Sequence, residues 1–218
     1  MEFSCDILIA TYNRKKFEKL ITHNILTQSY PLIKNIIIAD DGEDEQIYLP
    51  VPYNIFYFKV PRMTIGTKRN FLLEKSTSRF AVFFDTDDFY NKEYISESIY
   101  NLLDTGKSIS GTSAMLLYSN NQYYKLNCIY LHALNEATIC IDTSKIKFRF
   151  NNTMTSEALE PLKLVIGQIV ETNIDSIMCC VAHSNNTVDK KIWTNDKYKI
   201  KDLDGYDLHV KLLSQINI

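Results

Sequence analysis

Short apolar runs that each end in a polar cluster are the feature that most restricts the fold of this chain. Three runs end in this way: residues 3–10 before Thr11-Tyr12-Asn13-Arg14, residues 36–39 before Asp40-Asp41-Gly42, and residues 79–84 before Asp85-Thr86-Asp87-Asp88. Continuous apolar runs of this length, bounded by turn residues, are typical of strands that are buried on both faces. The polar residues that follow would then stand at the strand ends.

Amphipathic helices are predicted between these strands. Apolar residues at three- and four-residue spacing predict a helix over about 17–25, and a second is expected over 64–75, after a further strand at 54–59. Strands alternating with such helices favour a parallel sheet covered on both faces. We therefore expect an α/β fold of Rossmann-like type with a mostly parallel central sheet, in which the three polar clusters meet at one crevice.

The second half of the chain has a different pattern. We expect strands at 111–118, 122–131, 136–141 and 174–182, a helix at 156–171, and a polar tail from residue 183. This pattern predicts a small antiparallel extension of the central sheet. No linker separates the halves, so we expect one domain over residues 1–218.

Charge and hydropathy exclude several functional classes. The 218 residues include 24 Lys plus Arg and 26 Asp plus Glu, with no basic block, which argues against nucleic-acid binding. No apolar run approaches the roughly 20 residues of a membrane helix. The start Met-Glu-Phe-Ser-Cys-Asp lacks a secretory signal, so a cytoplasmic protein is expected. The abundance of Asn, Ile, Lys and Tyr is typical of an AT-rich microbe or a virus. A viral protein would lie in the host cytoplasm.

The five cysteines are expected to be reduced packing residues. They are odd in number, lack Cys-x-x-Cys spacing and lie in apolar stretches: Cys5, Cys128, Cys140, Cys179 and Cys180.

The carboxylates of Asp85, Asp87 and Asp88 are the strongest chemical signal. Like charges this close raise one another's pKa unless a cation neutralises them. Carboxylate oxygens favour hard divalent ions such as Mn²⁺ or Mg²⁺. The alternative is a solvated acidic turn that caps the next helix.

Four motifs in series resemble the family 2 glycosyltransferases of GT-A fold. They are Ile7-Leu8-Ile9-Ala10-Thr11-Tyr12-Asn13-Arg14, Ile38-Ala39-Asp40-Asp41-Gly42, Gly66-Thr67-Lys68-Arg69-Asn70 and Phe84-Asp85-Thr86-Asp87-Asp88. The resemblance covers residues 3–100 well and the rest loosely. It implies a nucleotide-binding half at 1–100, an acceptor-binding half at 101–218, and sugar transfer from a nucleotide-diphosphate sugar, with uridine expected.

The resemblance also implies roles for individual residues. Nucleotide and donor contacts would come from Thr11, Tyr12, Arg14, Asp41, Lys68, Arg69, Asn70, Asp85 and Thr86. Asp87 would be the main metal ligand, with Asp85 and the late His183 beside it. The acceptor would be a glycan or a small hydroxyl compound.

An inverting transferase also needs a carboxylate that takes the proton of the acceptor hydroxyl. The resemblance places this base near a helix start in the second half, where Glu157 is the first candidate, Glu160 the second and Asp142 a third. The usual Glu-Asp pair is absent, and Glu157 is equally explained as an acid at a helix N-terminus.

Two other functions remain open at this point. A sugar-nucleotide nucleotidyltransferase shares the metal carboxylates, but it would carry a Gly-rich loop after the first strand, and residues 11–16 contain no glycine. A nucleotide-binding module without catalysis is compatible with the missing acidic pair. The chain is either one module of a larger polypeptide or acts on a small soluble acceptor.

Overall fold

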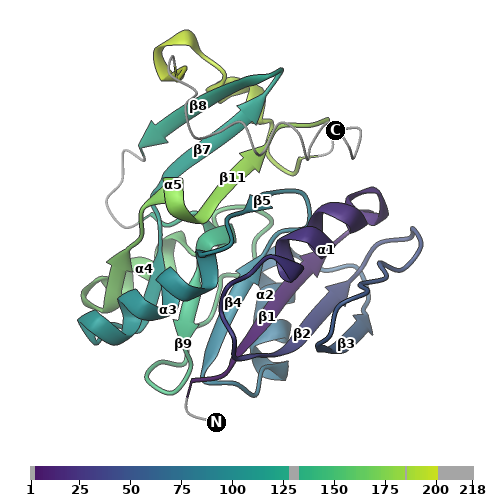
Figure 1. The fold of residues 1–218 in the computed structure, drawn as a ribbon, viewed down its shortest axis with the longest axis vertical. Coiled ribbons are helices and arrows are strands. Elements are labelled where there is room, and N and C mark those ends of the chain that lie inside the picture. The colour runs from purple at the N-terminus through teal and green to yellow at the C-terminus, as the bar shows by residue number, and fades with distance from the viewer. Residues whose placement is uncertain (1–2, 128–132, 185, 201–218) are drawn as a thin grey trace.

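A central sheet of seven strands organises the molecule. The structure, a computed structural model, describes residues 3–127, 133–184 and 186–200. The strands lie in the spatial order β10-β6-β9-β4-β1-β2-β3 (Figure 1). Their bounds are β1 Cys5–Thr11, β2 Ile33–Asp40, β3 Asn54–Lys59, β4 Phe80–Phe84, β6 Ile109–Gly111, β9 Cys140–Asp142 and β10 Ile169–Glu171.

The central sheet is mostly parallel, as predicted. Strand β1 pairs in parallel with β2 and β4, β2 pairs in parallel with β3, and β6 pairs in parallel with β10. Strand β9 runs antiparallel to its neighbours β4 and β6. The fold class expected from the sequence is therefore confirmed.

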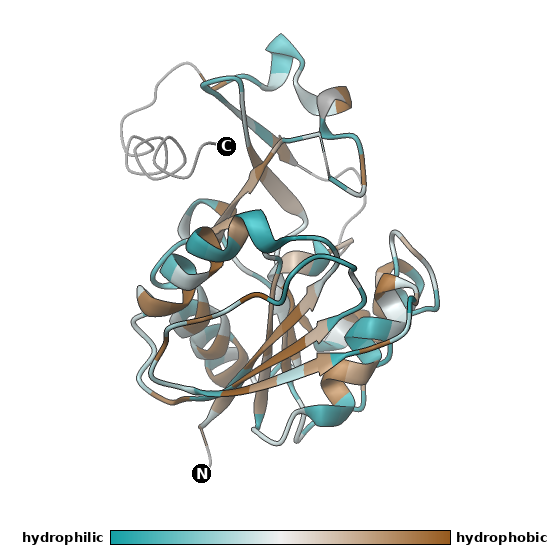
Figure 2. Ribbon diagram, turned by 90° about the vertical axis from the view of Figure 1, so that its right-hand side faces the viewer, coloured by the Kyte–Doolittle hydropathy of each residue, from teal (hydrophilic) through white to brown (hydrophobic). Residues whose placement is uncertain are grey.

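Helices cover both faces of this sheet, and the alternation of side chains along the strands explains why. Ile7 and Ile9 of β1 pack in a core with α1 (Glu18–Leu26) and α3 (Tyr94–Thr105). Leu8 points to the other face and packs in a core with α2 (Ile65–Lys75) and α4 (Leu159–Leu164). Figure 2 shows the resulting layer of hydrophobic strands between the helices.

A second, four-stranded sheet lies beyond the carboxyl ends of the central strands (Figure 1). Its order is β5 (Phe89–Tyr90), β11 (Met178–Val181), β7 (Ala114–Ser119) and β8 (Gln122–Asn127). The pairs β5–β11 and β7–β8 are antiparallel, whereas β11 and β7 are parallel. The predicted extension therefore exists, and it is mixed rather than purely antiparallel.

The elements of the second half differ most from the prediction. The helix expected at 156–171 ends at Leu164, because residues 169–171 pair as β10 with β6. The strand expected at 174–182 begins with the short helix α5 (Ile174–Ile177), where the side chain of Asn173 accepts a hydrogen bond from the backbone N–H of Asp175.

Two further expected strands are interrupted. Residues 136–138 of the strand expected at 136–141 form a 3₁₀ turn, and only 140–142 pair with β4 and β6. The strand expected at 111–118 is divided between β6 and β7. The strand expected at 122–131 is β8, whose predicted continuation lies outside the described residues.

Four of the five cysteines are free and buried: Cys5, Cys140, Cys179 and Cys180. Burial raises the pKa of the Cys140 thiol well above its usual range. Cys128 lies outside the described residues. The described cysteines are therefore the packing residues expected from the sequence. No helix in the described part of the chain is long and apolar enough to cross a membrane.

Candidate active site

The carboxyl ends of β1, β2 and β4 lie side by side at one edge of the central sheet. Thr11 pairs in register with Asp40 between β1 and β2, and Ile9 pairs with Phe84 between β1 and β4. The loops that follow these strands therefore begin at nearly the same level. The three polar clusters meet at this edge, as the sequence predicted.

Asp41 joins the loop after β2 to the start of α2. Its side chain is fully buried, and it accepts hydrogen bonds from Lys68 Nζ and, at 3.1 Å, from the backbone N–H of Met63. Lys68 Nζ also donates to the carbonyl oxygen of Thr11 at 2.8 Å. Burial lowers the pKa of Lys68, and the hydrogen bond and charge of Asp41 oppose that shift. A buried ion pair thus ties the first loop to α2.

Tyr12 and Arg62 form an aromatic and cationic stack beside Asp41. The guanidinium carbon of Arg62 lies 3.5 Å from the centroid of the Tyr12 ring, and Arg62 Nη1 donates to Asp41 Oδ2 at 3.1 Å. The Tyr12 side chain is otherwise accessible, with 39% of the residue exposed. A planar cation over an aromatic face offers a surface on which a flat ring can stack.

The hydroxyl of Thr11 is a buried polar group without a partner. Its Oγ1 atom is inaccessible and has no hydrogen-bond partner among the described residues. Leaving such a group unpaired costs about 1–3 kcal/mol. This hydroxyl lies at the end of β1, beside Tyr12, and is closed off from solvent.

The backbones of the loops after β1 and β2 pack directly against each other. A Cβ atom on Gly42 would lie 2.5 Å from the backbone N of Asn13, so no larger residue fits without a shift of the chain. Asn13 itself has φ 52°, and its Oδ1 accepts from the backbone N–H of Glu43 at 2.6 Å. This contact fixes the loop with Tyr12 against the loop with Asp41.

Arg69 is a buried cation between two acidic segments. Its Nη2 donates to Asp85 Oδ1 at 3.2 Å and its Nε donates to Glu157 Oε1 at 2.8 Å. The Arg69 side chain is 4% exposed. Burial alone would lower its pKa, but the charges of Asp85, Glu157 and Glu136 outweigh this and raise it. Arg69 therefore stays charged and holds Asp85 in place.

Gly66 brings the segment before α4 against α2. A Cβ atom on Gly66 would lie 1.8 Å from the carbonyl oxygen of Asn151, and the Gly66 N–H donates to the carbonyl of Thr153 at 3.2 Å. Only glycine permits this approach. This contact places residues 151–157 beside Arg69, which lies one helical turn after Gly66 in α2.

Asp87 contacts Arg14 and His183, which come from distant parts of the chain. His183 Nε2 is 2.9 Å from Asp87 Oδ2, and Arg14 Nη2 is 3.3 Å from the same atom. Burial would raise the pKa of Asp87, but the hydrogen bond from His183 and the charges of Arg14 and Lys190 lower it to about 2. Asp87 is therefore ionised at neutral pH.

Asp88 anchors the acidic loop to the second sheet. Its Oδ1 accepts a hydrogen bond from the backbone N–H of Val181 in β11 at 2.9 Å and forms an ion pair with Lys190 Nζ at 3.1 Å. Burial would lower the pKa of Lys190, but the charge of Asp88 outweighs this and raises it. The third carboxylate of the predicted cluster thus has a structural role.

Four predicted residues lie away from the cluster or have other partners. The amide of Asn70 exchanges two hydrogen bonds with the backbone of Phe150, at 2.9 and 2.8 Å, and so holds that segment. Glu160 is 64% exposed on α4 and pairs with Lys163. Asp142 pairs with Phe80, at the end of β4 opposite to Asp85. Its consideration as a possible base was therefore wrong, because it lies away from the acidic loop. Thr86 is buried beside Asp85.

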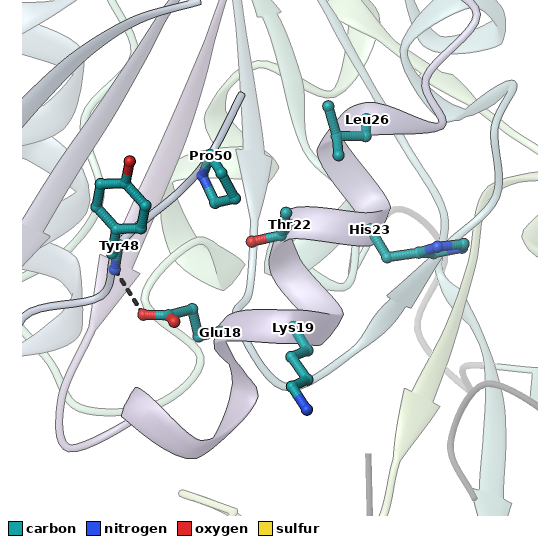
Figure 3. A pocket seen from close by; sticks show the side chains of 7 residues that line it. All are labelled: Glu18, Lys19, Thr22, His23, Leu26, Tyr48 and Pro50. Carbon is teal, nitrogen blue, oxygen red and sulfur yellow. Dashed lines mark hydrogen bonds between the residues drawn. The ribbon is translucent and has the colours of Figure 1, made fainter. Parts of the chain in front are cut away.

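A shallow hollow on the outer side of α1 lies apart from these residues (Figure 3). It has a volume of about 340 Å³ and is lined by Glu18, Lys19, Thr22, His23, Leu26, Tyr48 and Pro50. Glu18 Oε2 accepts a hydrogen bond from the backbone N–H of Tyr48 at 2.6 Å, which holds the loop after β2 against the helix (Figure 3). No predicted site residue lines this hollow.

Comparison with known families supports the grouping of these residues. The profile of glycosyl transferase family 2 matches residues 6–156, which include the three strand-end clusters. The chain belongs to glycosyl transferase family 2.

Two curated relatives match part of the chain. Poly(ribitol-phosphate) beta-N-acetylglucosaminyltransferase TarS of Staphylococcus aureus is 26% identical over 106 residues, covering 45% of this chain and 18% of TarS. Glycosyltransferase GlyA of Streptococcus pneumoniae is 23% identical over 140 residues, covering 60% of this chain and 19% of GlyA. The chain thus spans less than a fifth of these relatives.

Solved structures of similar fold support the GT-A architecture of this family 2 chain. A fragment of S. aureus TarS in complex with UDP-GlcNAc superposes with a TM-score of 0.62 at 14% identity, covering 85% of this chain and 60% of the fragment. A mannosyltransferase of Pyrobaculum calidifontis in complex with GDP-Man and Mn²⁺ superposes with a TM-score of 0.58 at 11% identity, covering 84% and 58%.

Asp85 and Asp87 could bind a divalent ion whose remaining ligands are water and phosphate oxygens. Among the described residues, no group of three or more His, Cys, Asp or Glu side chains forms a metal cage. Asp85 is 30% exposed, and its Oδ2 atom has no partner in that part of the chain. Mg²⁺ is commonly held by one or two carboxylates together with waters and substrate phosphates. The donor set at this edge fits that arrangement.

Arg62, Lys190 and Glu136 belong to the site but were not predicted from the sequence. Arg62 follows β3 at the same sheet edge, so its position at a strand end was a usable signal. Lys190 lies in the polar tail, and Glu136 is a single acid among apolar residues. Neither residue lies in a sequence motif from which its place in the site could be predicted.

Proposed function

We propose that this chain transfers a sugar from a nucleotide-diphosphate sugar, with uridine as the expected base, to a hydroxyl acceptor. The observation that carries the proposal is the meeting of Tyr12, Asp41, Asp85 and Asp87 at one sheet edge. It combines a stacking surface, buried polar groups, the partly exposed carboxylate of Asp85 and the buried carboxylate of Asp87. These are the elements required to hold a base, a ribose and a diphosphate.

In this proposal the nucleoside lies over Tyr12. The exposed ring and the guanidinium of Arg62 stack with the base, and Thr11 fixes the first loop through its carbonyl oxygen, which accepts a hydrogen bond from Lys68. Asp41 orients Arg62 and the first loop, because its own oxygens are occupied by Lys68, Arg62 and the Met63 amide. The similarity to a TarS fragment that binds UDP-GlcNAc supports uridine as the base.

Asp85 and Asp87 would hold Mn²⁺ or Mg²⁺ against the diphosphate, with His183 beside Asp87. The bound ion would neutralise the negative charge that develops on the departing diphosphate. Arg14 contacts Asp87 and would help to neutralise the phosphates. Arg69 orients Asp85 through a hydrogen bond from its Nη2 atom.

We propose that transfer proceeds with inversion and that the second sheet forms the acceptor side. The strands β7, β8 and β11 lie beyond the strand ends that hold the donor (Figure 1). An acceptor bound there would face the donor sugar across the acidic loop. This assigns residues 1–100 to the nucleotide and residues 101–218 to the acceptor.

The direct test is release of the nucleoside diphosphate from a panel of nucleotide sugars. UDP-GlcNAc, UDP-glucose and GDP-mannose would be incubated with the 218-residue chain and Mn²⁺, with and without EDTA. We expect release from a uridine donor that stops when the metal is chelated. Binding of UDP without turnover of any donor would instead support a nucleotide-binding module.

A further inference from the structure

Three carboxylates surround the buried guanidinium of Arg69, and they differ in what they contact. Glu157 Oε1 accepts from Arg69 Nε at 2.8 Å, and Asp85 Oδ1 accepts from Nη2 at 3.2 Å. Glu136 contacts the same guanidinium through its backbone, because its carbonyl oxygen accepts from Nη1 at 3.3 Å. Its side-chain carboxylate forms no hydrogen bond or ion pair with another side chain of the described residues, and it accepts a hydrogen bond from the backbone of Ala158. The backbone of Glu136 and the carboxylates of Asp85 and Glu157 therefore share one guanidinium.

The position of Glu136 is fixed by a short 3₁₀ turn. The turn Glu136–Thr138 begins after Asn135, whose side chain accepts from the backbone N–H of Ala137. The carbonyl of Ala137 in turn accepts from Tyr90 Oη at 3.0 Å and from Tyr94 Oη at 3.4 Å. Glu136 is thus held on a rigid support and remains partly accessible.

The surroundings of Glu136 favour a carboxyl group that exchanges a proton near neutral pH. Burial and the charge of Glu157 raise its pKa to about 7, while Arg69 and the backbone of Glu136 and Ala158 act in the other direction. Asp85 contacts the same guanidinium, at its Nη2 atom. A general base is most effective when its pKa is close to the working pH.

We propose that Glu136 is the general base that accepts the proton of the acceptor hydroxyl. This inference rests on the proposed sugar transfer. As the acceptor oxygen forms its bond to the anomeric carbon, its proton passes to the Glu136 carboxylate. The bond between the anomeric carbon and the phosphate oxygen breaks, and its electron pair leaves with the nucleoside diphosphate. The number of charges and protons is conserved.

The carboxylates predicted from the sequence are less suited to this step. Glu157 is 4% exposed and bonded to Arg69, so protonating it would break a buried ion pair. Glu160 is 64% exposed on α4 and paired with Lys163, and it has no contact with Arg69 or Asp85 among the described residues. Glu136 is partly accessible, and its backbone contacts the same guanidinium that binds Asp85.

The experiment compares Glu136→Gln with the wild type, using whichever of UDP-GlcNAc, UDP-glucose and GDP-mannose the wild type turns over fastest. We expect kcat for nucleotide release to fall by about 10²–10³-fold, with KM for the donor and Kd for UDP within about threefold of the wild type. Glu136→Asp keeps an ionisable group and is expected to retain more activity than Glu136→Gln. Glu74→Gln removes an exposed glutamate of α2 and is the matched control.

The pH profile separates a base from a residue that only supports the site. Wild-type kcat is expected to be about tenfold lower at pH 6 than at pH 8, whereas residual Glu136→Gln activity is expected to be independent of pH in this range. Wild-type turnover that persists within threefold in Glu136→Gln, or an unchanged acid limb, overturns the inference while the proposed function stands. Absence of turnover from every donor in the wild type overturns the proposed function, and this inference with it.

Discussion

The Nε atom of Arg69 donates a hydrogen bond to Oε1 of Glu157 at 2.8 Å, and each side chain is 4% exposed. The bond joins α2 to the segment before α4, which is distant in sequence. Because both charges are out of water, neither tolerates the loss of the other. The pair therefore fixes the position of Arg69, which in turn binds Asp85.

We expect Glu157→Ala to lower the free energy of unfolding by about 2–4 kcal/mol, because it leaves a buried guanidinium with one carboxylate fewer. Chemical denaturation followed by circular dichroism measures this. Glu160→Ala removes an exposed partner of Lys163 and is expected to change the value by less than about 0.5 kcal/mol. Equal effects of the two substitutions would show that the buried pair has no special weight.

Tyr12→Ala is expected to weaken UDP binding by about tenfold, because stacking of a base on an aromatic ring contributes roughly 1–3 kcal/mol. Isothermal titration calorimetry in the presence of Mn²⁺ measures the Kd. Tyr48→Ala, which removes a 70% exposed tyrosine from the hollow beside α1, is the control and is expected to leave the Kd unchanged. A parallel loss in both variants would contradict the assignment of Tyr12 to the nucleoside.

Asp87→Ala is expected to abolish the dependence of UDP affinity on Mn²⁺. In the wild type we expect Mn²⁺ to strengthen UDP binding, because the ion would link Asp85 and Asp87 to the diphosphate oxygens. Calorimetry of UDP with Mn²⁺ and with EDTA gives the ratio of the two affinities for each protein. If the wild-type affinity is the same under both conditions, the acidic loop is not a metal site.

The stability of Glu136→Gln is expected to exceed that of the wild type at pH 8 and to match it near pH 4. The pKa of Glu136 is raised to about 7 in the folded protein, above its ordinary value in an unfolded chain. Folding therefore favours the protonated form, so the wild type loses stability as the pH rises from about 4.5 to about 7, and this loss is complete at pH 8. Glutamine has no such penalty. Thermal unfolding at both pH values measures the difference, and a less stable variant at pH 8 would refute the raised pKa.

The sequence by itself determined the framework of the site. Apolar strands ending in polar clusters are a local pattern, and they correctly predicted the parallel order of β1, β2 and β4 and the meeting of Thr11, Asp41 and Asp85 at one edge. The first and last residues of β3 and α2 were also predicted from local periodicity, to within one residue. These features depend on nearby residues, which a sequence displays directly.

The tertiary structure decided which charged groups meet. Asp88 with Lys190 and Arg69 with Glu157 are pairs of residues far apart along the chain, and no spacing rule connects their members. The family resemblance had placed His183 beside Asp87, and the folded chain brings these two side chains together. The short helix α4 and strand β10 likewise depend on pairing with β6 rather than on local periodicity. Glu136 is the clearest case, because its environment comes from burial and from Arg69 and Glu157, which only the folded chain brings beside it.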